Sequence, residues 1–332
     1  HSPQNITLDF SGPNTAKQMH VGHIRSTIIG ESIARLLEIQ GHKVIRDNHL
    51  GDWGTQFGIL LYSIKRSNIS LDELGDEPVA QLEDLYRKGN SWVKDDEAAL
   101  EQARNELVKL QNGDSENNEL WQKIRDLSLS SFEKIYELLG IKFDYSHGES
   151  FYRDQVDQIY SALLKNEICV EDQGALVVFH PEHKRFSKQP FIIRKSDGAS
   201  NYATTDLATL AFRTKEWKSS HIVYVTDGRQ RDHFEQLFMT TRKWFKKEKM
   251  ETPTLSHVWF GTILGEDNKA IKTRDGQPVK LLDLLNEAID RSKKMVLEKN
   301  PDLDAEEVDR RSKIIGLGAV RYADLSQDRT LD

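Results

Sequence analysis

The sequence predicts an α/β fold built on a doubly wound parallel sheet, and neighbouring segments near its start carry this prediction. Residues Ile6 to Phe10 form a short β-type run, and Ser11 to Asn14 supply turn residues after it. From about Gly22 to Gln40, apolar residues recur with the 3.6-residue period of an amphipathic helix, and Gly41 stands where a C-cap glycine is expected. Lys43 to Arg46 then reads as a strand. This β-loop-α-β order is typical of doubly wound sheets.

Later segments interrupt the sheet and then resume it. The stretch from about Ser63 to Asp126 is charged and has helical periods with few long apolar runs, which indicates a helical insertion. A second insertion combines a helix around Gln155 to Lys165 with β-type runs at Ala175 to Phe179 and Phe191 to Arg194. The run from His221 to Thr226 has the apolar character of a buried strand. After about Leu281 the pattern is helical again.

Composition limits the classes of protein that are possible. The 332 residues are 37% hydrophobic and 30% charged, and no stretch approaches the roughly 18 consecutive apolar residues of a membrane span. A single cysteine, Cys169, excludes an internal disulfide framework and favours a reducing compartment, so a cytoplasmic location is expected. The 46 basic and 53 acidic residues give a net charge of −7, so a nucleic-acid partner would have to be held by local basic patches. The chain begins at His1 rather than Met, which suggests a fragment.

The most informative motif is His20-Val21-Gly22-His23, which lies between the first loop and the long predicted helix. The free N–H groups and the dipole of a helix N-terminus favour anions, and two imidazoles there can reach phosphate oxygens. Gly22 has no side chain, so an adenine ring could lie against the backbone. The motif predicts ATP binding by His20, Gly22 and His23, although so short a pattern could also be a chance loop.

Longer stretches of sequence carry a family resemblance. The run from Ser11 to Thr27 closely resembles the arginine-specific branch of the class I aminoacyl-tRNA synthetases, whose first signature His20 to His23 matches. The resemblance continues through Asn48 to Gly58, Gly148 to Ser150 and Lys195 to Gly198. It covers almost the whole chain and implies a class I synthetase Rossmann-like sheet with two insertions and a C-terminal helical segment.

The second family signature is a lysine-bearing loop, and it resembles the run from Leu264 to Gly276. Charge accumulates on the departing pyrophosphate, so cationic side chains there would stabilise the transition state by several kcal/mol. Lys272 and Arg274 are the candidates, although a solvated basic turn is the plainer interpretation of the run alone. The usual Lys-Met-Ser-Lys wording is absent, and by resemblance Lys17, just before the first signature, compensates. His20, His23, Lys17 and Lys272 are the predicted catalytic residues.

The resemblance also predicts an arginine pocket. A guanidinium is planar and permanently charged, so carboxylates are its natural partners. By resemblance, Asp9 and Asp206 bind the guanidinium with Tyr202 beside them, and Glu149 is a third acidic candidate. Two further residues hold the α-amino and carboxylate groups of the substrate, Asn14 and Gln230. Each of these has a structural alternative, such as a helix cap for Asp206 or a core position for Tyr202. No metal site is expected.

The family implies an arginine-tRNA ligase that uses L-arginine, ATP accompanied by Mg²⁺, and tRNA(Arg), and we expect a monomer without membrane association. The expected division is a Rossmann-like catalytic domain formed by 1–62, 126–150 and 200–270, a helical insertion at 63–125 and an α+β insertion at 151–199. The signature loop and a helical connection toward an anticodon-binding domain, itself missing, would occupy 271–332. Family members generally need tRNA even for activation.

Two other functions are compatible with parts of the pattern. A small nucleotidyltransferase could use the same histidine signature, but such proteins are usually far shorter and lack the arginine pocket. A catalytically silent paralogue could act as an RNA-binding or scaffold module, but intact His20, His23, Lys17, Asp206 and Lys272 argue against this alternative. Preference for arginine over lysine and citrulline would separate the three.

Overall fold

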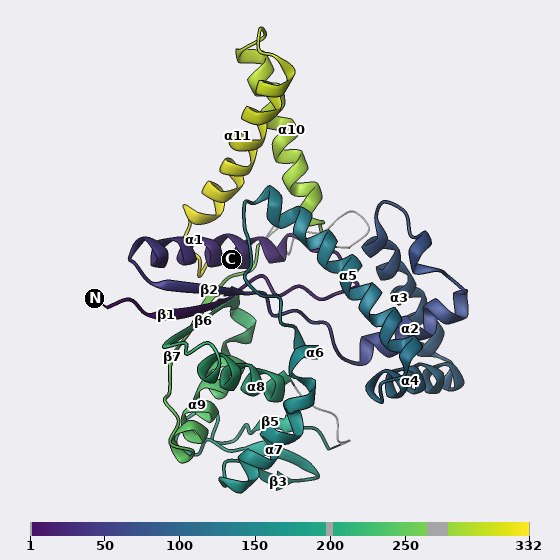
Figure 1. Ribbon diagram of the computed structural model, residues 1–332, viewed down its shortest axis with the longest axis vertical. Coiled ribbons are helices and arrows are strands. Elements are labelled where there is room, and N and C mark those ends of the chain that lie inside the picture. Colours follow the sequence, from purple (N-terminus) through teal and green to yellow (C-terminus); the bar gives the residue numbers. More distant parts are fainter. Residues whose placement is uncertain (1, 197–201, 264–277, 332) are drawn as a thin grey trace.

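The structure, a computed structural model, describes residues 2–196, 202–263 and 278–331, and it confirms the α/β fold. Its main sheet contains the strands β1 (Asn5–Asp9), β2 (Lys43–Asp47), β6 (His221–Asp227) and β7 (Thr254–Phe260). All three pairings are parallel, and the strand order is β2-β1-β6-β7. The predicted strands near residues 6, 43 and 221 are therefore neighbours in one sheet, at the centre of Figure 1.

Helices cover both faces of this sheet. Helix α1 (Gly22–Ile39) lies on one face, and α8 (Tyr202–Lys215) and α9 (Arg231–Lys247) lie on the other (Figure 1). Successive side chains of a strand point to opposite faces, so β6 contributes to both hydrophobic cores. Ile222 and Tyr224 pack in the α8–α9 core, whereas Val223 and Val225 pack in the α1 core. This two-sided burial confirms that the sheet is doubly wound.

Helix α1 follows the predicted period closely. Ile24, Ile28 and Ile29 are buried in the core shared with the sheet, because they recur on the face that meets it. The helix ends at Ile39, and Gly41 follows with φ +87°, a backbone conformation that glycine adopts without a steric penalty. The chain then turns directly into β2.

A helical region lies beside the carboxyl end of the sheet, at the right of Figure 1. Asp96 and Asp114 cap two of its helices through bonds to the amides of Ala99 and Asn117. Because α5 continues across position 125, the predicted boundary between 125 and 126 falls inside one helix. The region comprises α2 (Thr55–Ser67), the 3-10 turn η1 (Leu71–Glu73), α3 (Pro78–Lys94), α4 (Glu97–Gln111) and α5 (Ser115–Leu138).

A second region lies on the same side of the sheet as α8 and α9, at the bottom of Figure 1. It contains a small antiparallel sheet of order β3-β4-β5. The sequence predicted β4 and β5 but not β3, whose three residues include the exposed Val170. The elements here are α6 (Glu149–Tyr152), the 3-10 turn η2 (Arg153–Gln155), α7 (Val156–Lys165), β3 (Val170–Asp172), β4 (Ala175–Val178) and β5 (Phe191–Arg194). A further 3-10 turn, η3 (Gly228–Gln230), precedes α9.

The last two helices form a hairpin that projects from the body, at the top of Figure 1. They are α10 (Leu281–Lys299) and α11 (Ala305–Leu325). Across the part of the chain that the structure describes, no helix has both the length and the apolar character that crossing a membrane requires.

Arg25, in the first turns of α1, connects this hairpin to the end of the sheet. Its Nε donates to Asp324 Oδ1 of α11 at 3.0 Å. Its Nη1 donates to the carbonyl oxygens of Gly261, just after β7, and of Leu331, at 2.8 and 3.0 Å. The side chain is 6% exposed, so one buried guanidinium joins the start of α1, the end of β7 and the residues around the end of α11.

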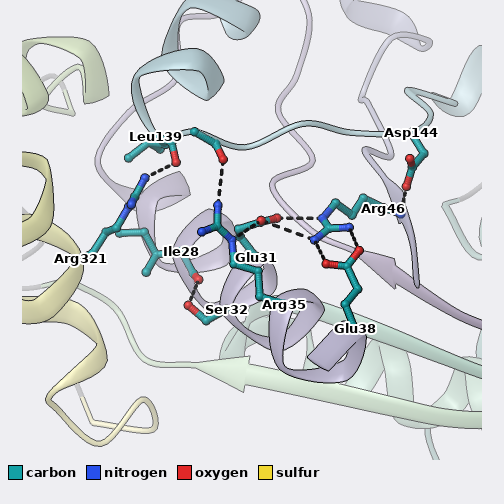
Figure 2. A network of polar contacts seen from close by, with 10 residues as sticks. Ile28, Glu31, Ser32, Arg35, Glu38, Arg46, Leu139, Asp144 and Arg321 are labelled. Carbon is teal, nitrogen blue, oxygen red and sulfur yellow. Dashed lines mark hydrogen bonds and ion pairs between the residues drawn. The ribbon is translucent and has the colours of Figure 1, made fainter. Parts of the chain in front are cut away.

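A second polar network joins α1 to the edge strand β2 (Figure 2). The guanidinium of Arg46 on β2 donates to Glu31 Oε2 at 2.9 Å and to both oxygens of Glu38 at 2.6 and 2.9 Å. Glu31 also accepts from Arg35 Nε at 2.7 Å, and the amide of Arg46 donates to Asp144 Oδ2 at 2.8 Å. The Arg46 and Glu31 side chains are only 12% and 11% exposed, so this pair is largely shielded from solvent.

We predict that Arg46→Met destabilises the fold by roughly 3 kcal/mol, because Glu31 would lose the largely buried partner of its ion pair and keep the half-exposed Arg35, while Glu38 would lose both of its bonds to Arg46. Urea denaturation followed by far-UV circular dichroism measures this change in the free energy of unfolding.

The matched control for this prediction is Arg87→Met. Arg87 pairs with Asp84 on the surface, where side chains are 58% and 56% exposed, so its loss is expected to cost less than about 1 kcal/mol. Equal effects of the two substitutions would contradict a stabilising role for the Arg46 network.

Candidate active site

A cleft of about 860 Å³ opens where the carboxyl ends of β1 and β6 meet the N-terminus of α1. The carboxyl edge of a parallel sheet is the usual ligand site of a doubly wound fold. The structure brings most of the sequence-predicted site residues together here. Those lining the cleft are Asp9, Asn14, His20, Gly22, His23, Glu149, Tyr202, Asp206 and Gln230.

Lys17 is not among the described residues that line the cleft. The Lys17 ammonium lies over the ring of Tyr86 on α3, 5.6 Å from its centroid, although it is close enough to lower the pKa of His20. Lys272 and Arg274 lie outside the described residues. The described residues on either side of that segment, Ile263 and Pro278, both line the cleft.

The two signature histidines pack against each other at the start of α1, with ring centroids 4.2 Å apart. The Gly22 amide donates to His20 Nδ1 at 3.1 Å, so this nitrogen carries no proton and the neutral ring is protonated at Nε2. A Cβ on Gly22 would lie 2.8 Å from the His20 ring, which explains why glycine is needed here. Gly22 therefore fixes the orientation of the His20 ring, both by its amide and by its lack of a side chain.

Burial holds both imidazoles in the neutral state near pH 7. Desolvation lowers the pKa of His23 to about 4, and His20 beside it acts in the same direction. Burial also lowers the pKa of His20, with Arg229 and Lys17 adding to this effect and Glu83 opposing it. Both side chains are therefore available as hydrogen-bond donors rather than as cations.

Backbone bonds fix the signature to the segment that leads into α10. The Val21 amide donates to Val279 O at 2.9 Å, and the Leu281 amide donates to Met19 O at 2.9 Å. The start of α1 and the chain just beyond the predicted lysine loop are thus held side by side. This pairing is the structural link between the two signatures that the sequence places more than 240 residues apart.

Asn14 and Gln230 both line the cleft, from the loop after β1 and from η3. The Asn14 side chain occupies the space that a Cβ on Gly51 would need, so these two loops approach closely only because Gly51 has no side chain. The Thr15 amide donates to Gly51 O, and the Gly51 amide donates to Pro13 O, both at 3.1 Å. The loop that carries Asn14 is therefore anchored on both sides.

Glu149 is positioned by a buried carboxylate beneath it. Asp52, with no solvent exposure, accepts from the amide of Ser150 at 2.9 Å, from its hydroxyl at 2.8 Å and from Arg125 Nε at 3.1 Å. These bonds cap the first turn of α6, of which Glu149 is the first residue. The Glu149 amide donates to Leu50 O at 3.0 Å. The carboxylate of Glu149 is consequently presented from a fixed backbone.

The environment of Glu149 favours its protonated form. Burial raises its pKa to about 7; Asp206 and Asp52 act in the same direction, while His49 opposes them. Partial desolvation and the neighbouring Glu149 likewise raise the pKa of Tyr202, which lies at the start of α8 and, at 69% exposed, is not a core residue. A carboxyl group whose pKa is raised in this way is typical of a functional site, and a bound cation would stabilise its ionised form.

Asp206 lies between two histidines. His233 Nε2 donates to Asp206 Oδ2 at 2.6 Å, and His49 Nε2 lies 4.0 Å from Asp206 Oδ1. Both histidines line the cleft. Asp206 does not cap a helix, since it lies in the second turn of α8 and its carboxylate faces the cleft.

Asp9 lines the cleft but already has an internal partner. The fully buried Arg213 donates through Nη2 to Asp9 Oδ2 at 2.6 Å and to Asp47 Oδ2 at 2.8 Å. Burial opposes the charge of Arg213, yet Asp9, Tyr224 and Asp47 raise its pKa further above the ordinary value. A role of Asp9 in binding a second guanidinium stays a prediction.

Sequence reasoning missed four residues of the site: His49, Arg213, Arg229 and His233. His49 follows a predicted strand within the quoted run Asn48 to Gly58, and its place at a strand's carboxyl end was the available signal. Arg213 is the one charged side chain among the buried residues of α8, which is a weaker signal. Nothing in the local sequence indicates that Arg229 and His233 line the cleft.

The cleft and the sheet together define a doubly wound α/β domain with an acidic pocket beside its histidine signature. Residues 1–332 match the family described as "tRNA synthetases class I (R), catalytic domain". The chain belongs to this family, as the resemblance to the arginine-specific branch predicted.

Individual relatives agree with this assignment. The chain is 44% identical over 335 residues to the arginine--tRNA ligase of Cellvibrio japonicus, covering 99% of this chain and 57% of that protein. It is 45% identical over 334 residues to that of Pseudomonas putida, covering 99% of this chain and 56% of the relative. The chain therefore spans a little over half the length of these relatives.

Solved structures show the same fold. The arginyl-tRNA synthetase of Plasmodium falciparum superimposes with a TM-score of 0.81 at 33% identity, covering 100% of this chain and 54% of that one. The enzyme of Thermus thermophilus gives a TM-score of 0.76 at 20% identity, covering 100% of this chain and 60% of that one. The second likeness supports the fold alone.

The raised pKa of Glu149 predicts a pH-dependent stability. In the unfolded chain Glu149 loses its proton near pH 4.5, whereas in the folded chain it keeps it until about pH 7. Between these values the unfolded state is favoured by releasing the proton, so stability falls as pH rises. Glu149→Gln removes this loss, and we expect the variant to gain stability over the wild type between pH 4.5 and 7. Urea denaturation at several pH values measures this difference.

The control for this prediction is Glu137→Gln, on the outer face of α5. It should show the same difference from the wild type at all of these pH values. A Glu149→Gln difference that does not change with pH would contradict the shifted pKa.

Proposed function

We propose that this chain carries the active site of an arginine-tRNA ligase, which activates L-arginine with ATP and transfers it to the 3′ end of tRNA(Arg). The observation that carries the proposal is the convergence of Glu149 and Asp206 on the cleft that His20 and His23 also line. An acidic pocket beside a phosphate-binding helix N-terminus suits a cationic amino acid that must react with ATP. Membership of the family supports the same activity.

Glu149, Asp206 and Tyr202 are proposed to bind the guanidinium of arginine. Their side chains come from α6 and α8 and face one cleft, where burial has already raised the pKa of Glu149 to about 7. A guanidinium would be strongly favoured there because it restores the ionised form of Glu149. Asp9, at the end of β1, would add negative charge to the pocket while its Oδ2 stays bonded to Arg213.

Asn14 and Gln230 are proposed to hold the α-amino and carboxylate groups of the amino acid. Their amide groups can both donate and accept, which suits a zwitterion. With the guanidinium in the acidic pocket, Asn14 and Gln230 would direct the carboxylate of the amino acid toward the N-terminus of α1. Positioning of this kind is the main source of catalysis when the protein supplies no nucleophile.

His20, Gly22 and His23 are proposed to bind ATP. The neutral imidazoles would donate hydrogen bonds to phosphate oxygens, and the N-terminus of α1 would add its partial positive charge. Full positive charge would come from Lys17, Lys272 and Arg274. Lys17 would have to leave the ring of Tyr86 to reach the phosphates.

The proposed activation step needs no covalent bond to the protein. A carboxylate oxygen of arginine attacks the α-phosphorus of ATP, the bond to the bridging oxygen breaks, and pyrophosphate leaves with the electron pair. The terminal adenosine hydroxyl of tRNA then attacks the arginyl-adenylate and releases AMP. The residues named above would position the reactants and stabilise the charge on the leaving group.

Mg²⁺ is proposed to enter as part of the nucleotide substrate. Among residues 2–196, 202–263 and 278–331, no group of three or more His, Cys, Asp or Glu side chains could hold a metal ion. We further propose that the protein is a monomer and is located in the cytoplasm.

Binding of amino acids to this chain tests the proposal. Isothermal titration with arginine should give saturable binding, whereas lysine and citrulline should bind at least about a hundredfold more weakly, since neither offers a charged planar fork. Equal binding of arginine and lysine would overturn the arginine assignment. ATP–pyrophosphate exchange that depends on arginine but needs no tRNA would contradict the proposed tRNA requirement.

Arginine binding should depend on pH in a defined direction. The guanidinium pairs with the ionised form of Glu149, whose pKa is about 7 in the free protein. Affinity should therefore rise by up to about tenfold per pH unit below pH 7 and level off above it. Calorimetric titration from pH 5.5 to 8.5 measures the profile.

The control for this profile is Glu149→Gln, which should bind arginine more weakly and flatten the rise. A wild-type profile that survives in the variant would assign the titration to another group.

Gly22→Ala should weaken ATP binding by roughly tenfold, or about 1.4 kcal/mol, because the new Cβ displaces the His20 ring. Fluorescence titration with a labelled ATP analogue measures this loss. Gly318→Ala is the matched control, since a Cβ there meets nothing within 4 Å. Unchanged nucleotide binding in Gly22→Ala would show that the orientation of His20 is not needed.

A further inference from the structure

His49 occupies a central place in the acidic part of the cleft that the family signatures do not explain. It follows β2 and lines the cleft together with Asp9, Glu149 and Asp206. Its side chain is only 16% exposed, and its ring contacts the buried Tyr152 at a centroid distance of 5.8 Å. A histidine among three carboxylates is therefore a candidate for direct contact with a bound substrate.

The hydrogen bonding of His49 fixes which ring nitrogen carries the proton. Nδ1 lies 3.0 Å from the carbonyl oxygen of His147, and a carbonyl oxygen can only accept. Nδ1 is therefore the protonated nitrogen. A guanidinium bound beside His49 is a cation and therefore disfavours the imidazolium form of the ring. In the neutral ring Nε2 is an acceptor, and this is the nitrogen that faces Asp206.

Asp206 presents a second acceptor, Oδ1, which faces His49 Nε2. Its Oδ2 already accepts from His233 Nε2 at 2.6 Å, so Oδ1 remains on the side of His49. Oδ1 and His49 Nε2 are 4.0 Å apart, too far for a hydrogen bond. Two acceptors that face each other across such a gap need N–H donors between them, and a guanidinium carries donors only.

We propose that His49 determines specificity for arginine, with its Nε2 accepting an N–H of the substrate guanidinium beside Asp206 Oδ1. This inference rests on the proposed function and adds a neutral acceptor to its carboxylates. A neutral acceptor suits this place because a further carboxylate beside Asp206 and Glu149 would add like-charge repulsion in the empty pocket. His147 O is the positioning group, since it holds the ring in the accepting tautomer.

Two substitutions separate this role from a purely structural one. His49→Gln places an amide oxygen near the position of Nε2, whereas His49→Asn keeps a donor near Nδ1 that can still reach His147 O. The proposal expects His49→Gln to retain arginine affinity within about threefold and His49→Asn to lose at least about tenfold, the value of one hydrogen bond to a charged group. Calorimetric titration with arginine measures both.

Binding of the ATP analogue is the readout that a local specificity role should not move. It should remain unchanged in both variants, as should the urea midpoint of unfolding. His42→Gln, at the other end of β2, is the matched control and should leave arginine and nucleotide binding at the wild-type level.

The opposite ranking, with Asn retained and Gln impaired, would show that the bond to His147 is what matters and would overturn the proposal. Equal losses of arginine and nucleotide binding in both variants would also overturn it, as would no loss in either. If the wild-type chain binds no arginine, the proposed function itself fails, which is distinguishable from all of these results.

Discussion

The buried contact of Arg213 with Asp9 and Asp47 is the constraint on which the site depends. Asp9 and Asp47 end the neighbouring strands β1 and β2, and Arg213 belongs to the helix that carries Asp206 two turns earlier. A buried guanidinium with these partners cannot leave without exposing uncompensated carboxylates. The distance between the sheet edge and α8 is therefore fixed, and with it the place of Asp206 in the cleft.

Charge in this cleft is divided between two ends. The end near β1 and α8 concentrates carboxylates, whereas the signature end offers neutral imidazoles and the N-terminus of α1. Burial produces both conditions, since it raises the pKa of Glu149 and lowers that of His23. Under the proposed function, a cationic amino acid and a polyanionic nucleotide would occupy one cavity, each at the end that compensates its charge.

The sequence allowed β1, β2, β6, α1 and nine of the residues that line the cleft to be predicted, because they depend on local period and on contiguous motifs. It did not reveal Arg213 as the partner of Asp9, since that contact joins residues 204 apart along the chain. The position of Lys17 over Tyr86 depends likewise on how α3 packs beside the signature. Strand β3 was missed because three residues carry too little pattern. Strand β7 was missed because Ser256 and His257 interrupt its apolar run.

Arg25 gives the hairpin of α10 and α11 a mechanical connection to the cleft. The same buried side chain grips Asp324 on α11 and the carbonyl of Gly261 at the cleft wall, and it stands on the helix that begins with the signature glycine. Removing the Arg25 guanidinium would leave the Asp324 carboxylate and the carbonyl oxygens of Gly261 and Leu331 without their shared buried donor. The placement of the hairpin and the shape of the cleft wall therefore rest on the same side chain.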